Sequence, residues 1–297
     1  RDGVLVSLVY GQTIADHIDP IEKKPLFHFL PGSRAFSVAT PGCNFRCTFC
    51  QNWEISQMPR QADRIAGRPF SPADIAMSAH STGCAVVAYT YTEPTIFAEY
   101  ALDTAAAAHA LGLKNVFVSN GYMSGKLLEL MAGRIDGINV DLKAGRGEFY
   151  HRLSGAGLAP VLANLKTIQR LGIWLEVTTL VIPGLNDSDE ELRWVAGYLL
   201  AELGPDVPWH VSRFHPAYRL RSVPPTPAAT LERAWQIGRD AGLHYVYVGN
   251  LPGHPAESTA CPCCGAPLIE RAGYQIYRNR LAGGRCPICN APIAGVF

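Results

Sequence analysis

The chain has 297 residues, enough for one large domain with a small appendix. Hydrophobic residues make up 48% and charged residues only 17%, which argues against a disordered chain and favours a well-packed core. The net charge of +1 argues against a nucleic-acid or anionic-membrane partner, and no apolar run approaches the ~20 residues of a membrane span.

Residues 1–34 are expected to form an irregular N-terminal extension. The run Val4–Tyr10 has the length of a strand, and Asp19–Pro25 is expected to be a rigid, solvated loop because prolines flank its charged residues. The chain begins at Arg1 without a Met, so we expect residues upstream of it. Nine clustered cysteines and the absence of a signal peptide favour metal ligation in a reducing cytoplasm.

Residues 35–250 alternate short β-branched runs with helix patterns that have readable caps, which predicts a parallel sheet with right-handed crossovers. Six or seven such units are too few for a closed eight-stranded barrel. We therefore expect an α/β fold, a partial (β/α)6 barrel with its site past the carboxyl ends of the strands. The predicted strands are Ala35–Ala39, Ala85–Tyr89, Asn115–Ser119, Gly137–Leu142, Ile173–Ile182, His210–Phe214 and Tyr245–Gly249. The predicted helices begin after Ser71, cover Ile96–Ala110, Leu158–Leu171 and Asp187–Leu203, and open again at Pro227.

Three cysteines follow the first predicted strand as C-x3-C-x2-C: Cys43, Cys47 and Cys50. Three thiolates can hold three irons of a [4Fe–4S] cluster and leave the fourth iron open to a small molecule. A structural zinc site needs four ligands, and this loop has no fourth Cys or His. A zinc loop, a ferredoxin-type cluster completed from elsewhere and free buried thiols remain the alternatives at this point.

Polar residues follow several other strands. Glu93 stands at a helix start, where an acid is also favoured by the helix dipole. Asp141 and Lys143 share one face of a strand end, where they bind a ligand or pair with each other. The further candidates are Ser119 and Asn120 after the third strand, His215 after the sixth, and, more weakly, His210 and Arg213.

The C-terminal residues 251–297 are expected to form a separate small domain of the rubredoxin or zinc-ribbon type. Two knuckles place Cys261, Cys264, Cys286 and Cys289 as four ligands of zinc or iron, with an auxiliary cluster as the lesser alternative. The knuckle turns call for left-handed residues at Gly265 and Asn290. A unit this small needs the metal to fold. Cys263 is spare, Cys84 is expected to be a buried apolar residue, and Arg271, Arg278, Arg280 and Arg285 are candidates to offset the thiolate charge.

The cysteine loop with Phe49 before its last cysteine resembles the motif of the radical S-adenosylmethionine (SAM) enzymes. Together with Asp19–Phe29, Tyr91–Thr95, Asp141–Lys143 and the C-terminal knuckles, it resembles the radical SAM member of the AmmeMemoRadiSam system, which is related to pyruvate-formate-lyase activating enzyme. Where the activases have two glycines and an aspartate, this chain has Tyr91, Thr92 and Val118. The resemblance implies that the open iron chelates SAM. The implied SAM contacts are Phe49 against the adenine, Glu93 at the amino group, and Ser119, Asn120, Asp141, Lys143 and His215.

The resemblance also implies the reaction. A reduced cluster cleaves SAM to methionine and a 5′-deoxyadenosyl radical, which abstracts hydrogen from a substrate that the sequence does not identify. A flavodoxin or ferredoxin is implied as electron donor. Two alternatives stay open: an activase that installs a glycyl radical on a partner protein, and a non-catalytic zinc-binding interaction module.

Overall fold

The computed structural model describes residues 6–297. The first part of the strand expected at Val4–Tyr10 lies outside the described residues, and Val6–Tyr10 forms no strand. Within the described residues, no helix combines the length and apolar character needed to cross a membrane.

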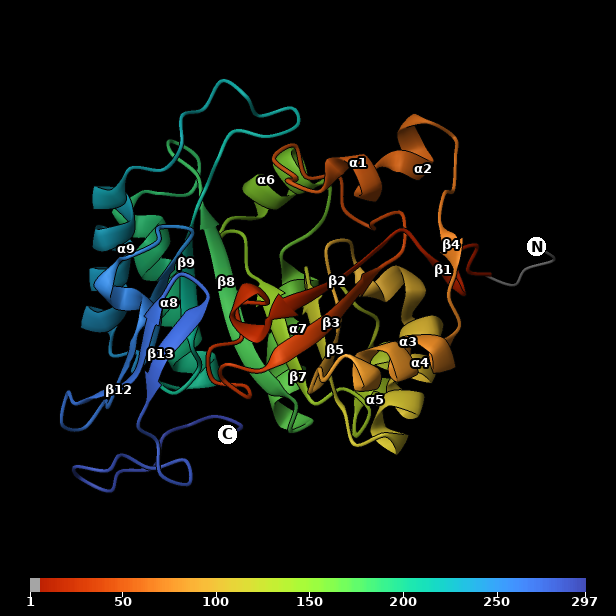
Figure 1. The fold of residues 1–297 in the computed structure, drawn as a ribbon. Coiled ribbons are helices and arrows are strands. Elements are labelled where there is room, and N and C mark those ends of the chain that lie inside the picture. The colour runs from red at the N-terminus through yellow and green to blue at the C-terminus, as the bar shows by residue number, and fades with distance from the viewer. Residues whose placement is uncertain (1–5) are drawn as a thin grey trace.

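One eight-stranded sheet organises the fold, in the order β10-β9-β8-β7-β6-β5-β3-β2 (Figure 1). All neighbours are parallel except β2, which pairs antiparallel with β3. All seven predicted strands form, each within one residue of its predicted ends, which confirms the α/β prediction. The bounds of the eight strands of this sheet are β2 Ala15–Pro20, β3 Arg34–Ala39, β5 Val86–Tyr89, β6 Lys114–Ser119, β7 Gly137–Asp141, β8 Trp174–Val181, β9 Trp209–Arg213 and β10 Val246–Gly249.

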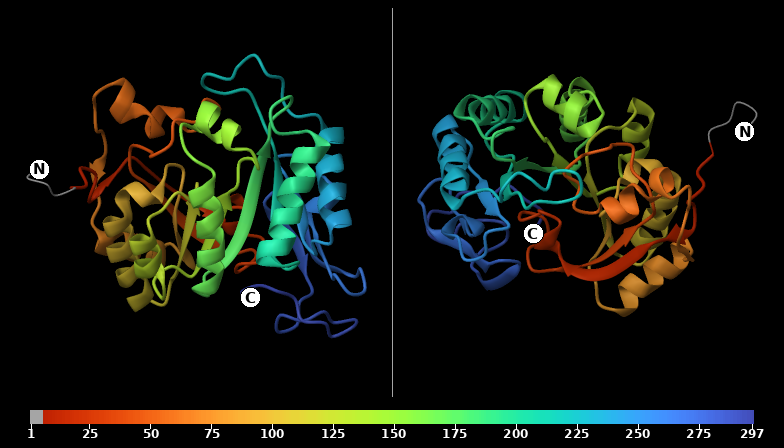
Figure 2. Two further views of the ribbon diagram at one scale, coloured as in Figure 1. Left: turned by 180° about the vertical axis from the view of Figure 1, so that it is seen from behind. Right: turned by 90° about the horizontal axis from the view of Figure 1, so that it is seen from above.

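Helices lie in an arc outside this sheet, as the view from above shows (Figure 2, right). The predicted cap at Ser71 is confirmed, because its hydroxyl accepts a hydrogen bond from the backbone N–H of Asp74 at 3.1 Å. The helices are α1 Trp53–Ser56, α2 Met58–Gln61, α3 Pro72–Ser81, α4 Ala98–Ala110, α5 Gly125–Met131, α6 Gly147–Phe149, α7 Ala159–Arg170, α8 Asp189–Leu203 and α9 Ala228–Ala241, with short turns η1 Ile21–Lys23, η2 Pro94–Phe97, η3 Tyr150–Ser154 and η4 Pro255–Glu257.

The N-terminal segment differs from its prediction. Asp19 and Pro20 belong to β2, and η1 follows directly, so the segment is not an irregular loop. It is not solvated either: Ile21, Leu26 and Phe29 pack fully buried against residues of β3, β5 and β6. The burial of these apolar side chains overrides the local charge pattern from which a surface loop was predicted. β1 Gln12–Thr13 precedes this region and pairs antiparallel with β4 Arg68–Pro69, which follows it in the chain.

The C-terminal unit is a three-stranded antiparallel sheet of β11 Thr259–Ala260, β12 Pro267–Ala272 and β13 Gln275–Asn279. Its buried residues form one cluster with Phe27, Tyr245 and Tyr247 of the main body. The unit therefore shares its core with the sheet beside which it lies (Figure 1). The division of the chain at residues 34 and 250 stays a prediction.

Candidate functional site

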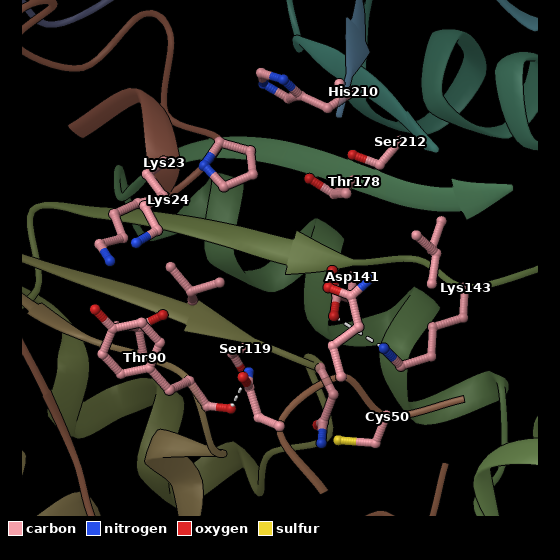
Figure 3. Close-up of a pocket in the computed structure, with 18 of the residues that line it drawn as sticks. Lys23, Lys24, Cys50, Thr90, Ser119, Asp141, Lys143, Thr178, His210 and Ser212 are labelled. Carbon is pink, nitrogen blue, oxygen red and sulfur yellow. Dashed lines mark hydrogen bonds and ion pairs between the residues drawn. The ribbon is translucent and has the colours of Figure 1, made fainter. Parts of the chain in front are cut away.

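A cavity of about 500 Å³ lies where the predicted site residues converge (Figure 3). Its lining comes from the loops and strand ends of β3 and β5 to β10 and from the N-terminal segment. Apart from His215, every residue predicted to hold the cluster or SAM lines it: Cys43, Cys47, Cys50, Phe49, Glu93, Ser119, Asn120, Asp141 and Lys143.

The three-cysteine loop begins at Gly42, whose φ of 109° needs a glycine and whose N–H donates to the carbonyl of Ile55 at 3.0 Å. The Cys43 sulfur accepts the backbone N–H of Phe45 at 3.3 Å. Burial, together with the nearby Glu93, raises the pKa of the Cys43 thiol. A thiolate here therefore needs a compensating positive charge, which bound iron would supply.

The three thiols fit a cluster better than the alternative sites. None of the nine cysteines is in a disulfide. Among residues 6–297, the only group of three or more metal-ligating side chains with their ligand atoms within 4.8 Å of one another is the C-terminal one, so the early loop does not present the closed tetrahedron of a zinc site. Three soft donors that line one cavity are the donor set of a cluster with one open iron.

Glu93 is buried and accepts four hydrogen bonds. One carboxylate oxygen accepts from the Thr95 N–H at 3.1 Å, the Thr95 hydroxyl at 2.6 Å and the Ser119 hydroxyl at 2.7 Å, and the other accepts from the Asn120 N–H at 2.8 Å. Burial raises the pKa of Glu93, and these donors oppose that rise. Glu93 therefore caps η2, as the helix-start interpretation holds, and also lines the cavity.

Asp141 and Lys143 form an ion pair of 2.8 Å, so the mutual pairing considered from the sequence is present (Figure 3). The Lys143 side chain is 11% exposed, and its ammonium lies 5.8 Å from the centre of the Phe49 ring. Burial opposes the charged form of Lys143, but Asp141 and Cys47 outweigh it and raise the pKa of the amine. A cation is thus held beside the cysteine loop.

His215 is exposed and is not among the residues that line the cavity. From the same strand, His210 and Ser212 line it instead, two residues apart and hence on one face. The two-residue period of a strand was the sequence signal for these two residues. A strand presents alternate residues to its inner face, whereas His215 follows the strand end. His210 is buried against Glu176 at 2.7 Å.

Sequence reasoning also missed a group of lining residues on other elements. They are Lys23 and Lys24 of the N-terminal segment, Thr90 and Tyr91 after β5, Thr178 and Leu180 of β8, and Asn250 and Tyr274. For Lys24, no local signal separates a buried lysine from a surface one, because its burial depends on strands distant in the sequence.

The C-terminal cysteines form a second candidate metal centre. The sulfurs of Cys261 and Cys289 lie 3.6 Å apart, and those of Cys264 and Cys286 3.7 Å apart. A tetrahedral ion with metal–sulfur bonds of about 2.3 Å gives sulfur–sulfur distances of about 3.8 Å, so the four thiols fit such an ion. The left-handed turns are confirmed, with φ of 73° at Gly265 and 58° at Asn290.

The two other cysteines and the four arginines predicted to offset the thiolate charge lie in different surroundings. Cys263 is exposed outside the group of four, and Cys84 is buried in the core as expected. Arg271 does not offset the thiolates, because it is buried against Phe27 and Glu22. Arg278 and Arg280 pair with Glu270, and only Arg285 contacts a knuckle, at the Asn290 carbonyl.

Residues 37–194 match the radical SAM superfamily. "Uncharacterized protein MJ0808" of Methanocaldococcus jannaschii is 45% identical over 294 residues, which cover 98% of this chain and 87% of that protein. The benzylsuccinate synthase activating enzyme of Thauera aromatica is 33% identical over 36% of this chain and 33% of its own length. The pyruvate formate-lyase-activating enzyme of Clostridium pasteurianum is 22% identical over 57% of this chain and 70% of its own length.

Among solved structures, a radical SAM methyltransferase from Sphaerobacter thermophilus superposes with a TM-score of 0.57 at 17% identity, over 80% of this chain and 71% of that one. That likeness shows the fold. The family match covers more than half of the chain, and the sequence relatives include activating enzymes. This chain therefore belongs to the radical SAM superfamily.

Proposed function

We propose that the chain is a radical SAM enzyme in which Cys43, Cys47 and Cys50 hold a [4Fe–4S] cluster and SAM occupies the adjoining cavity. The observation that carries the proposal is the convergence of the three thiols and six of the seven predicted SAM contacts on one cavity. When bound and reduced, the cluster supplies the electron that cleaves SAM to methionine and a 5′-deoxyadenosyl radical, which takes hydrogen from the substrate.

The chain's own residues bind and orient SAM. Phe49, 3% exposed, offers an aromatic face for the adenine, and the Lys143 ammonium a charge for the carboxylate. Glu93, with Ser119 and Asn120 fixed by its hydrogen bonds, offers acceptors for the amino group. The Asp141 carboxylate contacts the ribose hydroxyls. Walls formed by the buried members of this set, Phe49, Glu93, Ser119 and Asn120, exclude water from the reacting atoms.

The proposal also includes the electron donor, the metal of the C-terminal site and the division of the chain into domains. A cytoplasmic flavodoxin or ferredoxin supplies the electron, and the four C-terminal thiols hold zinc or iron. The motifs named in the sequence analysis support a place in the AmmeMemoRadiSam system. The barrel spans residues 35–250 and the ribbon 251–297.

Anaerobic reconstitution with iron and sulfide tests the cluster and the cleavage together. We expect about four irons per chain in addition to any metal held by the C-terminal thiols, and formation of 5′-deoxyadenosine from SAM after reduction, followed by mass spectrometry. Cys47→Ala should lose both, whereas Cys84→Ala, which removes a buried thiol outside the cavity, should keep both. A wild-type protein that takes up zinc alone and leaves SAM intact is instead the non-catalytic interaction module.

The activating-enzyme relatives favour one second candidate, an activase that removes hydrogen from a backbone glycine of a partner protein. Tyr91 and Thr92 stand where the activases have two glycines, and this difference argues against assigning the activase reaction to this chain from similarity alone. Deuterium transfer from a glycine of the partner into 5′-deoxyadenosine would identify an activase. Transfer from a small molecule would identify the first candidate.

A further inference from the structure

The segment Asp19–Phe29 crosses the inner face of the sheet. The Pro25 carbonyl accepts a hydrogen bond from the Asn139 side chain at 2.8 Å, and the N–H groups of Phe27 and His28 donate to Glu176 at 3.0 and 2.8 Å. Asn139 and Glu176 each lie two residues before a cavity-lining residue, Asp141 or Thr178, and so share its face of the strand. The segment is therefore the floor of the cavity, toward the amino ends of the strands.

Lys24 is the buried cation of this floor. The residue is 1% exposed and lines the cavity, and its ammonium lies 2.6 Å from Asp19 and 4.6 Å from the centre of the Tyr91 ring. Among the contacts of the described residues, Asp19 is its one hydrogen-bond acceptor, which leaves N–H donors of the ammonium unused. A buried N–H donor without an acceptor costs free energy of folding. We therefore expect a ligand in the cavity to accept the hydrogen bonds that Lys24 leaves unused.

The carboxylate that Lys24 contacts is already shared. Asp19 also accepts from the Lys23 ammonium at 2.8 Å, from the Ser37 hydroxyl at 3.0 Å and from the Tyr91 hydroxyl. Burial lowers the pKa of Lys24 to about 8 and Asp19 opposes that fall, so the amine stays charged at neutral pH.

The charges at this end of the cavity are of both signs. Glu22 faces Arg271 at 3.6 Å, and the buried Glu176 contacts His210 at 2.7 Å. Two ammonium groups contact the Asp19 carboxylate: Lys23 at 2.8 Å, with a side chain 44% exposed, and Lys24 at 2.6 Å, with a side chain 1% exposed. Lys24 is therefore the one of the two that solvent does not screen.

Tyr91 adds an independent sign of function. Its φ of 63° is left-handed, an outlier for a bulky residue, and the strain brings its ring under the Lys24 ammonium and its hydroxyl to Asp19. Strain of this kind persists where the surroundings impose it, and it clusters at ligand sites. The residue that replaces an activase glycine is thus part of the floor.

We propose that Lys24 binds the anionic group, a carboxylate or a phosphate, of a small-molecule substrate. The assignment rests on the proposed function of the same cavity. Lys23 and Lys24 lie at one end of the drawn cavity and Cys50 at the other (Figure 3), so an anchored anion presents the rest of the molecule toward the cysteines. Because Lys24 is 1% exposed, its partner must enter the cavity, which the surface of a folded protein cannot do.

Binding of two anion probes, inorganic phosphate and succinate, to the full chain tests the proposal by equilibrium dialysis. We expect the wild type to bind one of them, and Lys24→Met to weaken that binding by about tenfold or more because the charge is lost at nearly constant shape. The matched control is Lys126→Met, at a 78% exposed side chain, which should change nothing. Phosphate-only or succinate-only binding identifies the anion. Binding of neither, or equal binding by Lys24→Met, overturns the proposal.

A second measurement on the wild type does not depend on the variant folding. Hydrogen exchange read by peptide mass spectrometry should slow in residues 21–29 when the probe is bound and stay unchanged around Lys126. Equal exchange in residues 21–29 with and without the probe contradicts the site. Both measurements work without the cluster, so Lys24-dependent binding in a protein that fails to cleave SAM would refute the proposed function and leave the anion site standing.

Discussion

Glu93 ties two strand ends together through one carboxylate. Its oxygens accept from Thr95 after β5 and from Ser119 and Asn120 at the end of β6. Since every partner is a donor, the site is built for an acceptor on both oxygens. This side chain thus fixes the loops that line the cavity, in addition to any contact with a ligand.

We predict that Glu93→Gln lowers the stability of the fold. The amide would point an N–H₂ at a donor, the Asn120 N–H or the Thr95 and Ser119 groups, and should lower the free energy of unfolding by about 1–3 kcal/mol. Urea unfolding followed by circular dichroism measures it. The control is Glu129→Gln, at a 73% exposed side chain, which should fall within about 0.5 kcal/mol of wild type. Equal stability of the two variants would show that the four hydrogen bonds do not hold the loops.

Among the elements, the floor segment is fixed by buried polar groups more than by regular structure. His28 is buried, with one ring nitrogen 2.6 Å from the Ala294 carbonyl and the other 2.6 Å from the Tyr247 hydroxyl. It therefore links the floor to β10 and to the C-terminal unit. Burial lowers the pKa of His28 to about 4, although Glu176 opposes that shift.

The sign of the pH dependence follows from that pKa. Between about pH 6.5 and about pH 4 the unfolded chain binds a proton at His28 and the folded chain does not, so the stability present above pH 6.5 is lost as the pH falls. We expect the free energy of unfolding to drop by about 1 kcal/mol between about pH 7.5 and about pH 5.5, and His28→Gln to lack this drop. The same slope in both proteins would assign it to other groups. Urea titrations at the two pH values measure it.

In the whole molecule, the C-terminal unit and the sheet depend on each other. Cys261 and Cys286 belong to the same buried cluster as Phe27 of the floor and Tyr245 and Tyr247 around β10. Arg271 of β12 reaches the floor as well, donating to the Phe27 carbonyl at 2.8 Å. Order at the four cysteines is therefore coupled to the floor of the cavity.

Loss of the metal that the C-terminal cysteines bind should therefore also destabilise the floor segment. We expect Cys286→Ser to lower the midpoint of thermal unfolding by about 5 °C or more and to speed hydrogen exchange both in residues 259–297 and in residues 21–29. Cys263→Ser, at the exposed cysteine outside the group of four, serves as the control. Faster exchange confined to 259–297 would show that the unit is independent of the sheet.

The sequence by itself determined the strands, the capped helices and the cysteine motifs, and it named most of the predicted site residues that line the cavity. Period, caps and turn residues are local properties, and the rule that parallel strands end at one edge then gathers Cys43, Glu93 and Asp141 without any coordinates. His215 does not line the cavity, because the pleat of β9, and not nearness to its end, decides which residues face inward.

Only the tertiary structure decided the course of the N-terminal segment and the docking of the C-terminal unit. Pro25 and Asn139 are more than a hundred positions apart, as are Phe27 and Arg271, yet both pairs meet at the floor. A run of charges and prolines is compatible with a surface loop and with a buried floor. The choice depends on partners that distant strands supply, because a buried charge is stable only where they compensate it.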